Sequence, residues 1–317
     1  MSLDWARLTF RLNRFELLAF GGAVTLFIVL TVIAAARIDA VRPPAACLVY
    51  SETVAPPVTC EQLNRIWYDA QNGVIGISVV LVTFLSFAAA LFLGVSIVAR
   101  EVERGTTRLA WSLSPSRTRW FLARTVPVLV AVAVATYVGG VAIDRYMAAT
   151  VSDGDLANSF TSFGFRGLLI ASRAVFIFAV AVLVGAVVAR ALPAVILSAA
   201  VVAALLAGGE RVHLQLLAQE AVVVPTNMQT GEGDARPGDM WIDQKFVLPD
   251  GSLVDYGYFD GTDPYDEFGQ PKYPIVTLLV PGERYRFVET REAAALGGGS
   301  IVALGLAALV VKRRRPG

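Results

Sequence analysis

The sequence predicts an all-α polytopic membrane protein with six transmembrane helices, both chain ends in the cytoplasm, and a small α+β extracellular cap between the fifth and sixth helices. Hydrophobic residues make up 56% of the 317 residues and charged residues only 17%, values that a soluble domain rarely reaches. Six apolar runs are roughly twenty residues long, enough at ~1.5 Å per residue to cross a ~30 Å hydrocarbon core. Basic residues gather on one side of these runs.

The predicted segments divide the whole chain. The transmembrane helices occupy residues 17–36, 74–98, 125–143, 167–189, 191–209 and 293–311. The third contains Pro127 near its start, where a missing N–H does least damage. Extracellular parts are the loops 37–73 and 144–166 and the cap 210–292, and cytoplasmic parts are 1–16, 99–124, the tight turn at Arg190 and 312–317.

Residues 1–16 are predicted to form an amphipathic helix on the membrane surface, the alternative being a solvated N-terminus. Apolar residues share one helical face and arginines lie mostly on the other: Trp5, Leu8, Leu12 and Phe15 against Arg7, Arg11 and Arg14.

The orientation follows from the distribution of charge. With the N-terminus inside, the cytoplasmic parts hold fourteen basic and four acidic residues, and the rest of the chain holds thirteen basic and twenty-two acidic residues. Cytoplasmic loops carry an excess of Lys and Arg, so both chain ends are predicted to lie on the cytoplasmic side of a bacterial plasma membrane.

Cys47 and Cys60 both fall in the first extracellular loop, where a disulfide between them is predicted; two free thiols are the alternative. In an oxidising compartment, closing so short a loop contributes on the order of 3 kcal/mol under the chain-entropy model. The single histidine, His213, makes a histidine-based metal or triad site improbable, and no metal site is predicted.

The cap shows strand patterns around turn residues. Residues 245–248 and 253–259 flank Pro249-Asp250-Gly251, which predicts a β-hairpin. Residues 273–280 are rich in β-branched side chains and predict a third strand. Residues 211–221 are expected to form a short amphipathic helix where the fifth span emerges.

The charged stretch 99–124, here called the coupling segment, separates two long apolar runs. Arginines at 100, 104 and 108 recur at helical spacing, Glu103 precedes the break Gly105-Thr106, and Leu109 pairs with Leu113. Ser114-Pro115 ends this pattern, and Arg117 opens a second basic cluster. The segment is too polar to span a bilayer, so it is expected to lie on the membrane surface or to dock into a partner.

This pattern, Glu-x-Glu-x-Gly-Thr followed by an apolar patch and Ser-Pro-x-Arg, resembles the cytoplasmic loop between the second and third spans of ABC-2 type permeases. The resemblance implies the membrane subunit of an ABC exporter, working as a homodimer and docking on two copies of a separate P-loop ATPase that holds ATP and Mg²⁺. It implies no cofactor and no catalytic residue in this chain and no nucleic-acid partner. The implied ATPase-coupling residues are Glu101, Glu103, Arg104, Gly105, Thr106, Leu109 and Arg117. The alternative for the two glutamates is a charge-balanced membrane edge.

Three further features have two interpretations each. Arg173 in the fourth span is expected to reach the outer interface with its head group, or to line the translocation path and meet an anionic group. The acidic run 260–267 suggests calcium, but its spacing does not fit an EF-hand, which favours a solvated turn. Gly297-Gly298-Gly299 indicates close helix approach or a flexible point.

Absent motifs also narrow the function. The chain has no Gly-x-x-x-x-Gly-Lys-Ser/Thr, no His-Glu-x-x-His and no Gly-x-Ser-x-Gly, which argues against an enzyme. The predicted spans contain no Asp or Glu, which argues against a proton-coupled transporter. The second functional hypothesis is a membrane-anchored binding or sensing protein whose extracellular cap recognises a ligand.

Overall fold

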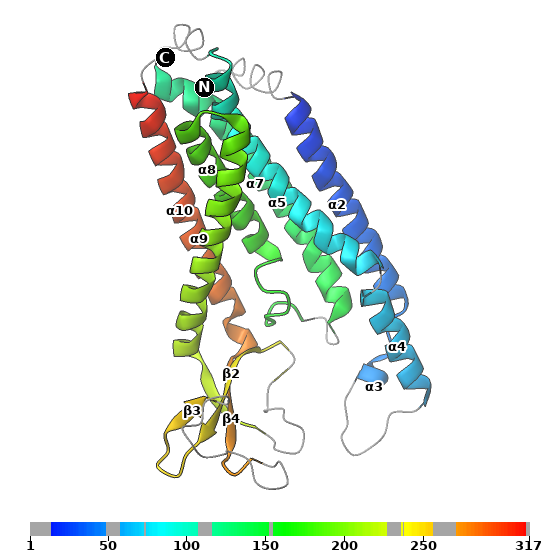
Figure 1. Cartoon of the computed structure of the whole chain (residues 1–317). Helices are drawn as coiled ribbons and strands as arrows, with labels where there is room; N and C mark the ends of the chain where they lie inside the picture. The colour runs from blue at the N-terminus through cyan, green and yellow to red at the C-terminus, as the bar shows by residue number, and fades with distance from the viewer. Residues whose placement is uncertain are drawn as a thin grey trace. The chain divides into compact units, whose positions relative to one another are not determined.

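The computed structural model describes residues 14–48, 58–72, 74–106, 116–151, 155–226, 236, 238–255 and 271–314 (Figure 1). Of residues 16, 58, 74–79, 81 and 82 only the backbone is described. The chain forms two compact units. The helical unit comprises Met1–Gly154, Ser162–Leu205 and Glu289–Gly317, and the sheet unit comprises Asp155–Thr161 and Leu206–Val288.

Six helices in the described part of the chain are long and apolar enough to cross a membrane, which confirms the predicted number. They are α2 (Arg14–Ala40), α5 (Val74–Glu103), α7 (Arg117–Thr150), α8 (Gly167–Val188), α9 (Ala191–Glu220) and α10 (Tyr285–Arg313). Most are longer than the apolar runs that predicted them, because hydropathy marks only the part suited to hydrocarbon. The loop after α2 holds two shorter helices, α3 (Ala45–Leu48) and α4 (Val58–Asn72).

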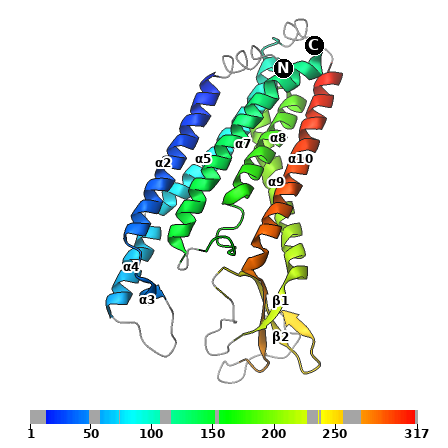
Figure 2. The ribbon, with the colours of Figure 1, turned by 180° about the vertical axis from the view of Figure 1, so that it is seen from behind.

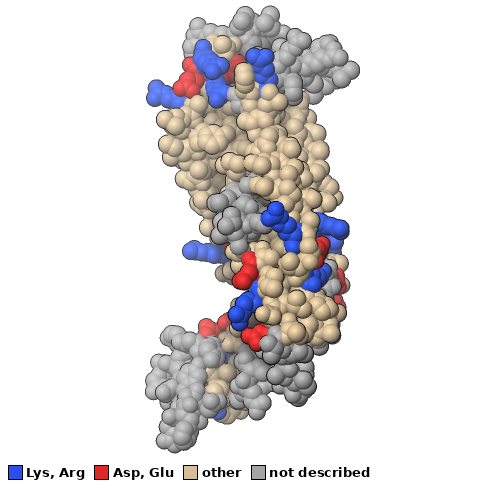
Figure 3. All heavy atoms as spheres, turned by 90° about the vertical axis from the view of Figure 1, so that its right-hand side faces the viewer, with Lys and Arg blue, Asp and Glu red and all other residues tan. Residues whose placement is uncertain are grey.

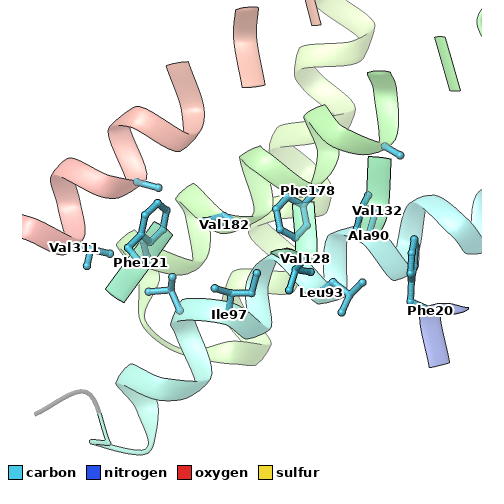
Figure 4. Close-up of a cluster of buried hydrophobic side chains, with 14 of the residues drawn as sticks. Phe20, Ala90, Leu93, Ile97, Phe121, Val128, Val132, Phe178, Val182 and Val311 are labelled. Atoms are coloured by element: carbon cyan, nitrogen blue, oxygen red, sulfur yellow. The ribbon is translucent and has the colours of Figure 1, made fainter. Parts of the chain in front are cut away.

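A hydrophobic core joins five of the long helices in the helical unit (Figure 4). Phe20 of α2, Leu93 of α5, Phe121 of α7, Phe178 of α8 and Val311 of α10 are all buried in it. The outward faces carry exposed apolar side chains, for example Leu26 at 50% and Val134 at 58% exposure. A space-filling view shows a broad band of uncharged surface, with charged side chains gathered near the helix ends (Figure 3). Such an apolar exterior suits a lipid environment.

Helices α5 and α8 touch through glycines. A Cβ atom on Gly94 would lie 2.6 Å from the backbone oxygen of Phe178, and one on Gly185 would lie 3.1 Å from that of Val95. Each helix therefore presents a glycine to the backbone of the other. Small residues allow such close backbone approach between membrane helices.

The sheet unit contains a four-stranded antiparallel sheet in the order β1-β4-β2-β3. Its strands are β1 (Val222–Pro225), β2 (Met240–Val247), β3 (Leu253–Asp255) and β4 (Ile275–Val280). β2 and β3 form the predicted hairpin, and β4 matches the predicted third strand. The sequence interpretation missed β1, whose four residues follow α9 almost directly (Figure 2).

The separate amphipathic helix predicted at residues 211–221 is wrong. These residues continue α9 up to Glu220 without a break. Glu210 and Arg211 end the apolar run because they are polar. Neither residue type breaks a helix, so the backbone hydrogen bonds of α9 continue past them.

The residues 155–161 belong to the sheet unit and pack against two glycines. The Phe160 N–H donates to the carbonyl oxygen of Gly238 at 2.7 Å. A Cβ atom on Gly282 would lie 1.8 Å from the backbone oxygen of Asn158, so no side chain fits there. The Gly282 N–H donates to Asp239 at 2.8 Å, which fixes the start of the short 3₁₀ helix η1 (Gly282–Arg284).

Candidate functional site at the ends of the long helices

The end of α5 is bound to α7 by an ion pair. Glu101 lies 2.8 Å from the guanidinium of Arg124, with side chains 22% and 10% exposed. The Arg124 guanidinium also lies over the Trp120 ring, 5.2 Å from its centroid, and the Thr106 hydroxyl donates to the second Glu101 oxygen at 2.6 Å. The carboxylate is thus held from both sides and shielded from most solvent.

The next acidic residue reaches a different helix. Glu103 accepts a hydrogen bond from the backbone N–H of Ala191 at 2.9 Å, where α9 begins. The first N–H groups of a helix lack intrahelical partners and carry partial positive charge, so a carboxylate is stabilising there. The end of α5 is therefore attached to both α7 and α9.

A turn follows these anchors and faces outward. The N–H groups of Arg104 and Gly105 bond back to the carbonyls of Arg100 and Val102, and Gly105 has φ +68°, a conformation that glycine adopts without strain. Residues 104–106 are exposed. The turn therefore offers an accessible tip on a fixed base.

Arg117 connects the start of α7 to the end of α10. The Ser116 side chain caps α7 by accepting from the N–H of Arg119 at 3.1 Å. The Arg117 guanidinium donates to the carbonyls of Lys312 and Arg314 at 3.2 and 2.5 Å. Arg314 in turn donates to the carbonyl of Ala186, in the last turn of α8, at 2.6 Å. Cations at these helix ends satisfy carbonyls that lack intrahelical partners.

The structure thus gives Glu101 and Glu103 partners within the chain, where the sequence interpretation had them facing a partner protein. It leaves Arg104, Gly105 and Thr106 exposed at the tip. Leu109 lies outside the described residues. Sequence reasoning missed Arg124 and Ala191 as partners, because both contacts are between residues far apart in the chain.

A second charged cluster lies where α8 begins. Arg173 forms an ion pair with Glu292 of α10 at 2.8 Å, with side chains 15% and 16% exposed. Its guanidinium lies 5.5 Å from the ring centroid of Phe165 and fills the space beside Gly164, where a Cβ atom would come within 2.5 Å of it. Arg173 is therefore held by the protein itself.

Glu289, one helical turn before Glu292, is buried with only 2% exposure. It accepts a hydrogen bond from the backbone N–H of Leu168 at 3.0 Å, at the start of α8. Glu289 lies before the predicted sixth span, 293–311, because α10 begins at Tyr285 and its first turns are too polar to belong to the apolar run.

Cys47 and Cys60 form a disulfide between α3 and α4, with Cα atoms 5.2 Å apart. Asn64 supports this pairing by donating from its side-chain amide to the Cys47 carbonyl at 3.2 Å. Trp67, two turns along α4 from Cys60, is 3% exposed. The described part of this loop therefore holds two helices that the disulfide joins.

Among the described residues, no group of three or more His, Cys, Asp and Glu side chains could hold a metal ion. The acidic run 260–267 lies outside them. Of the three glycines in α10, Gly299 approaches the Phe176 ring of α8, and Gly297 and Gly298 have open space around them.

Six apolar helices with polar anchors at their ends are typical of a membrane-embedded protein. A family model described as ABC-2 membrane transporter related matches residues 18–212, more than half of the chain, and the chain belongs to this family. It is therefore an ABC-2 type permease, a membrane transport subunit of a family whose members in general associate with an ATPase. Comparisons with curated proteins and with solved structures gave no match.

Proposed function

We propose that this permease is the membrane subunit of an ATP-driven exporter in a bacterial plasma membrane. Two copies form the translocation path, and each binds one separate P-loop ATPase through its coupling segment. ATP and Mg²⁺ are bound by the ATPase. This chain provides the path and the mechanical connection.

The observation that supports this proposal is the anchored turn at the end of α5. Glu101 fixes it to α7 through Arg124, and Glu103 fixes it to α9 through the Ala191 N–H. Its tip, residues 104–106, is accessible. A partner that displaces the tip therefore moves the ends of three membrane helices together.

In this mechanism the free energy of ATP binding shifts the permease between two arrangements, because the ATPase pair fits one of them better. The largely shielded Glu101–Arg124 pair makes the base of the turn stiff, so that movement of the tip is passed on. Glu101 and Glu103 position the turn, and the exposed tip of the turn contacts the ATPase.

The test is purification of the tagged chain from its native host in mild detergent, followed by identification of co-purifying proteins. We expect a soluble P-loop ATPase in near-equal amount, and we expect Arg104→Glu to lose it. The matched control is Arg65→Glu, another exposed arginine, on α4, whose ion pair with Glu61 is open to solvent. This control should retain the ATPase.

Recovery of the chain without an ATPase, or only with envelope proteins, would contradict the exporter proposal. That result would favour a membrane-anchored binding or sensing protein. Equal loss of the ATPase in Arg104→Glu and Arg65→Glu would contradict the proposed contact alone.

A further inference from the structure

Charged contacts hold helix α10 to the helical unit near its two ends. Near its start, Glu292 pairs with Arg173 and Glu289 accepts from the Leu168 N–H. At its end, its last carbonyls accept from Arg117. Both attachments are charge-assisted hydrogen bonds, which are about twice as strong as neutral ones.

The charges on α10 match the two ends of α8. Glu289 of α10 is the anion at the N-terminal amide of Leu168, and Arg314, the residue directly after α10, is the cation at the C-terminal carbonyl of Ala186. Each charge has the sign that the local end of the α8 dipole favours. α10 and the residue that follows it therefore cap α8 at both ends.

The middle of α10 meets the bundle with small side chains. Ala303 and Ala307 are buried at 6% and 0% exposure, and Gly299 lies against the Phe176 ring. These positions recur every four residues and form one narrow face. Opposite faces carry Ile301 at 75% and Val302 at 61% exposure. Leu304 and, near the helix end, Val310 and Val311 also pack in the hydrophobic core, so apolar contacts hold α10 together with the charged contacts near its ends.

The inner attachment lies next to the coupling segment. Arg117 is the first residue of α7 and follows the capping residue Ser116, so any displacement of this helix start acts on the α10 carbonyls directly. We propose that α10 is a rigid rod that carries movement of the coupling segment to the outer charged junction of Arg173, Glu289 and Glu292, whose opening accompanies transport. This inference rests on the proposed function.

Two-site spin labelling tests the proposal on the whole chain in lipid nanodiscs. Cysteines replacing Leu168 and Thr290 report on the outer junction, and cysteines replacing Val187 and Leu309 report on the inner end; all four positions are exposed. The native cysteines are joined to each other and will not react with the label.

The first arm uses the chain without an ATPase. Arg173→Gln should broaden the outer distance distribution and leave the inner one unchanged. The exchange of Arg173→Glu with Glu292→Arg should restore the narrow distribution. Arg65→Gln on α4 is the matched control and should change neither. An unchanged outer distribution in Arg173→Gln overturns the proposal, whether or not an ATPase binds.

The second arm uses the complex with its ATPase and a trapped ATP analogue. We expect the outer distance to shift in the wild type and to lose that shift in Arg117→Gln; loss of the ATPase itself in that variant would place Arg117 in the docking contact and overturn the rod. If Arg117 has only a structural role, the nucleotide-dependent shift persists in Arg117→Gln. That result would overturn the proposal that α10 transmits movement. If no ATPase binds, the proposed function is contradicted, and α10 cannot transmit ATP-driven movement. The first arm needs no ATPase, so it still tests whether the Arg173–Glu292 pair holds the outer junction closed.

Discussion

The carboxylate of Glu103 accepts a hydrogen bond from the N–H of Ala191, so the last residue of α5 holds the first residue of α9. Two residues earlier, Glu101 holds Arg124 of α7. The sequence predicts one charged surface segment at the end of α5. In the structure, two of its side chains bind within the chain, and only the tip that follows them is exposed.

The Glu101–Arg124 pair should contribute measurably to stability. Removal of one partner leaves the other charge largely desolvated, so Glu101→Gln and Arg124→Gln are each expected to lower the free energy of unfolding by roughly 2 to 3 kcal/mol. The double variant should cost less than the sum of the two. Denaturant unfolding of the purified chain in detergent measures the cycle, and strict additivity would show that the pair is not coupled.

The contact between α5 and α8 should reject any side chain at Gly94. Gly94→Ala places a methyl group 2.6 Å from the Phe178 oxygen, an overpacking that typically costs about 1 to 3 kcal/mol. Gly22→Ala in α2 is the control, since nothing lies within 4 Å of a Cβ atom there. That change should be neutral or stabilising by up to about 1 kcal/mol, because alanine is the better helix former. Thermal unfolding compares the two, and an equal response would refute the packing argument.

Gly282→Ala should disturb the sheet unit, because its methyl group would overlap the backbone oxygen of Asn158. We expect faster hydrogen–deuterium exchange in β2 and β4, while the exchange of α5 and α8 is unchanged. Gly305→Ala in α10 has open space and serves as the control. Identical exchange in the two variants would mean that the close approach of residues 155–161 is not required.

The disulfide should stabilise the loop that holds α3 and α4. The variant with Cys47→Ser and Cys60→Ser is expected to lose on the order of 3 kcal/mol of unfolding free energy, as the chain-entropy model gives for a loop of this size. A reducing agent should destabilise the wild-type chain similarly and leave the double variant unaffected. Insensitivity of the wild type to reduction would contradict this.

The turn between β2 and β3 should respond to acid. Both the hydroxyl and the N–H of Ser252 donate to Asp250, and they hold the pKa of the Asp250 carboxyl below its usual range. A lowered folded-state pKa means that the stabilisation is complete above the ordinary pKa of about 3.9 and is lost as the pH falls through the lowered value. Carboxyl NMR titration measures it, and Ser252→Ala should move the Asp250 pKa upward. An unchanged titration curve in that variant would count against the turn hydrogen bonds.

Local sequence patterns predicted the elements whose causes are local. The number of apolar helices follows from runs long enough to cross a bilayer, and the β2–β3 hairpin follows from Pro249-Asp250-Gly251 between strand-forming residues. The start of α10 and the full length of α9 were missed because polar residues such as Glu289 and Glu210 extend a helix without lengthening its apolar run.

By itself the sequence determined that this chain is a membrane protein with six apolar helices and a charged break between the second and third. Only the tertiary structure decided what the charges do. Arg173 meets Glu292, and Arg117 meets the end of α10, because folding brings together residues more than a hundred positions apart. Hydrophobic periodicity records which face of each helix avoids water, and it contains no information about which charged side chain will satisfy which helix end.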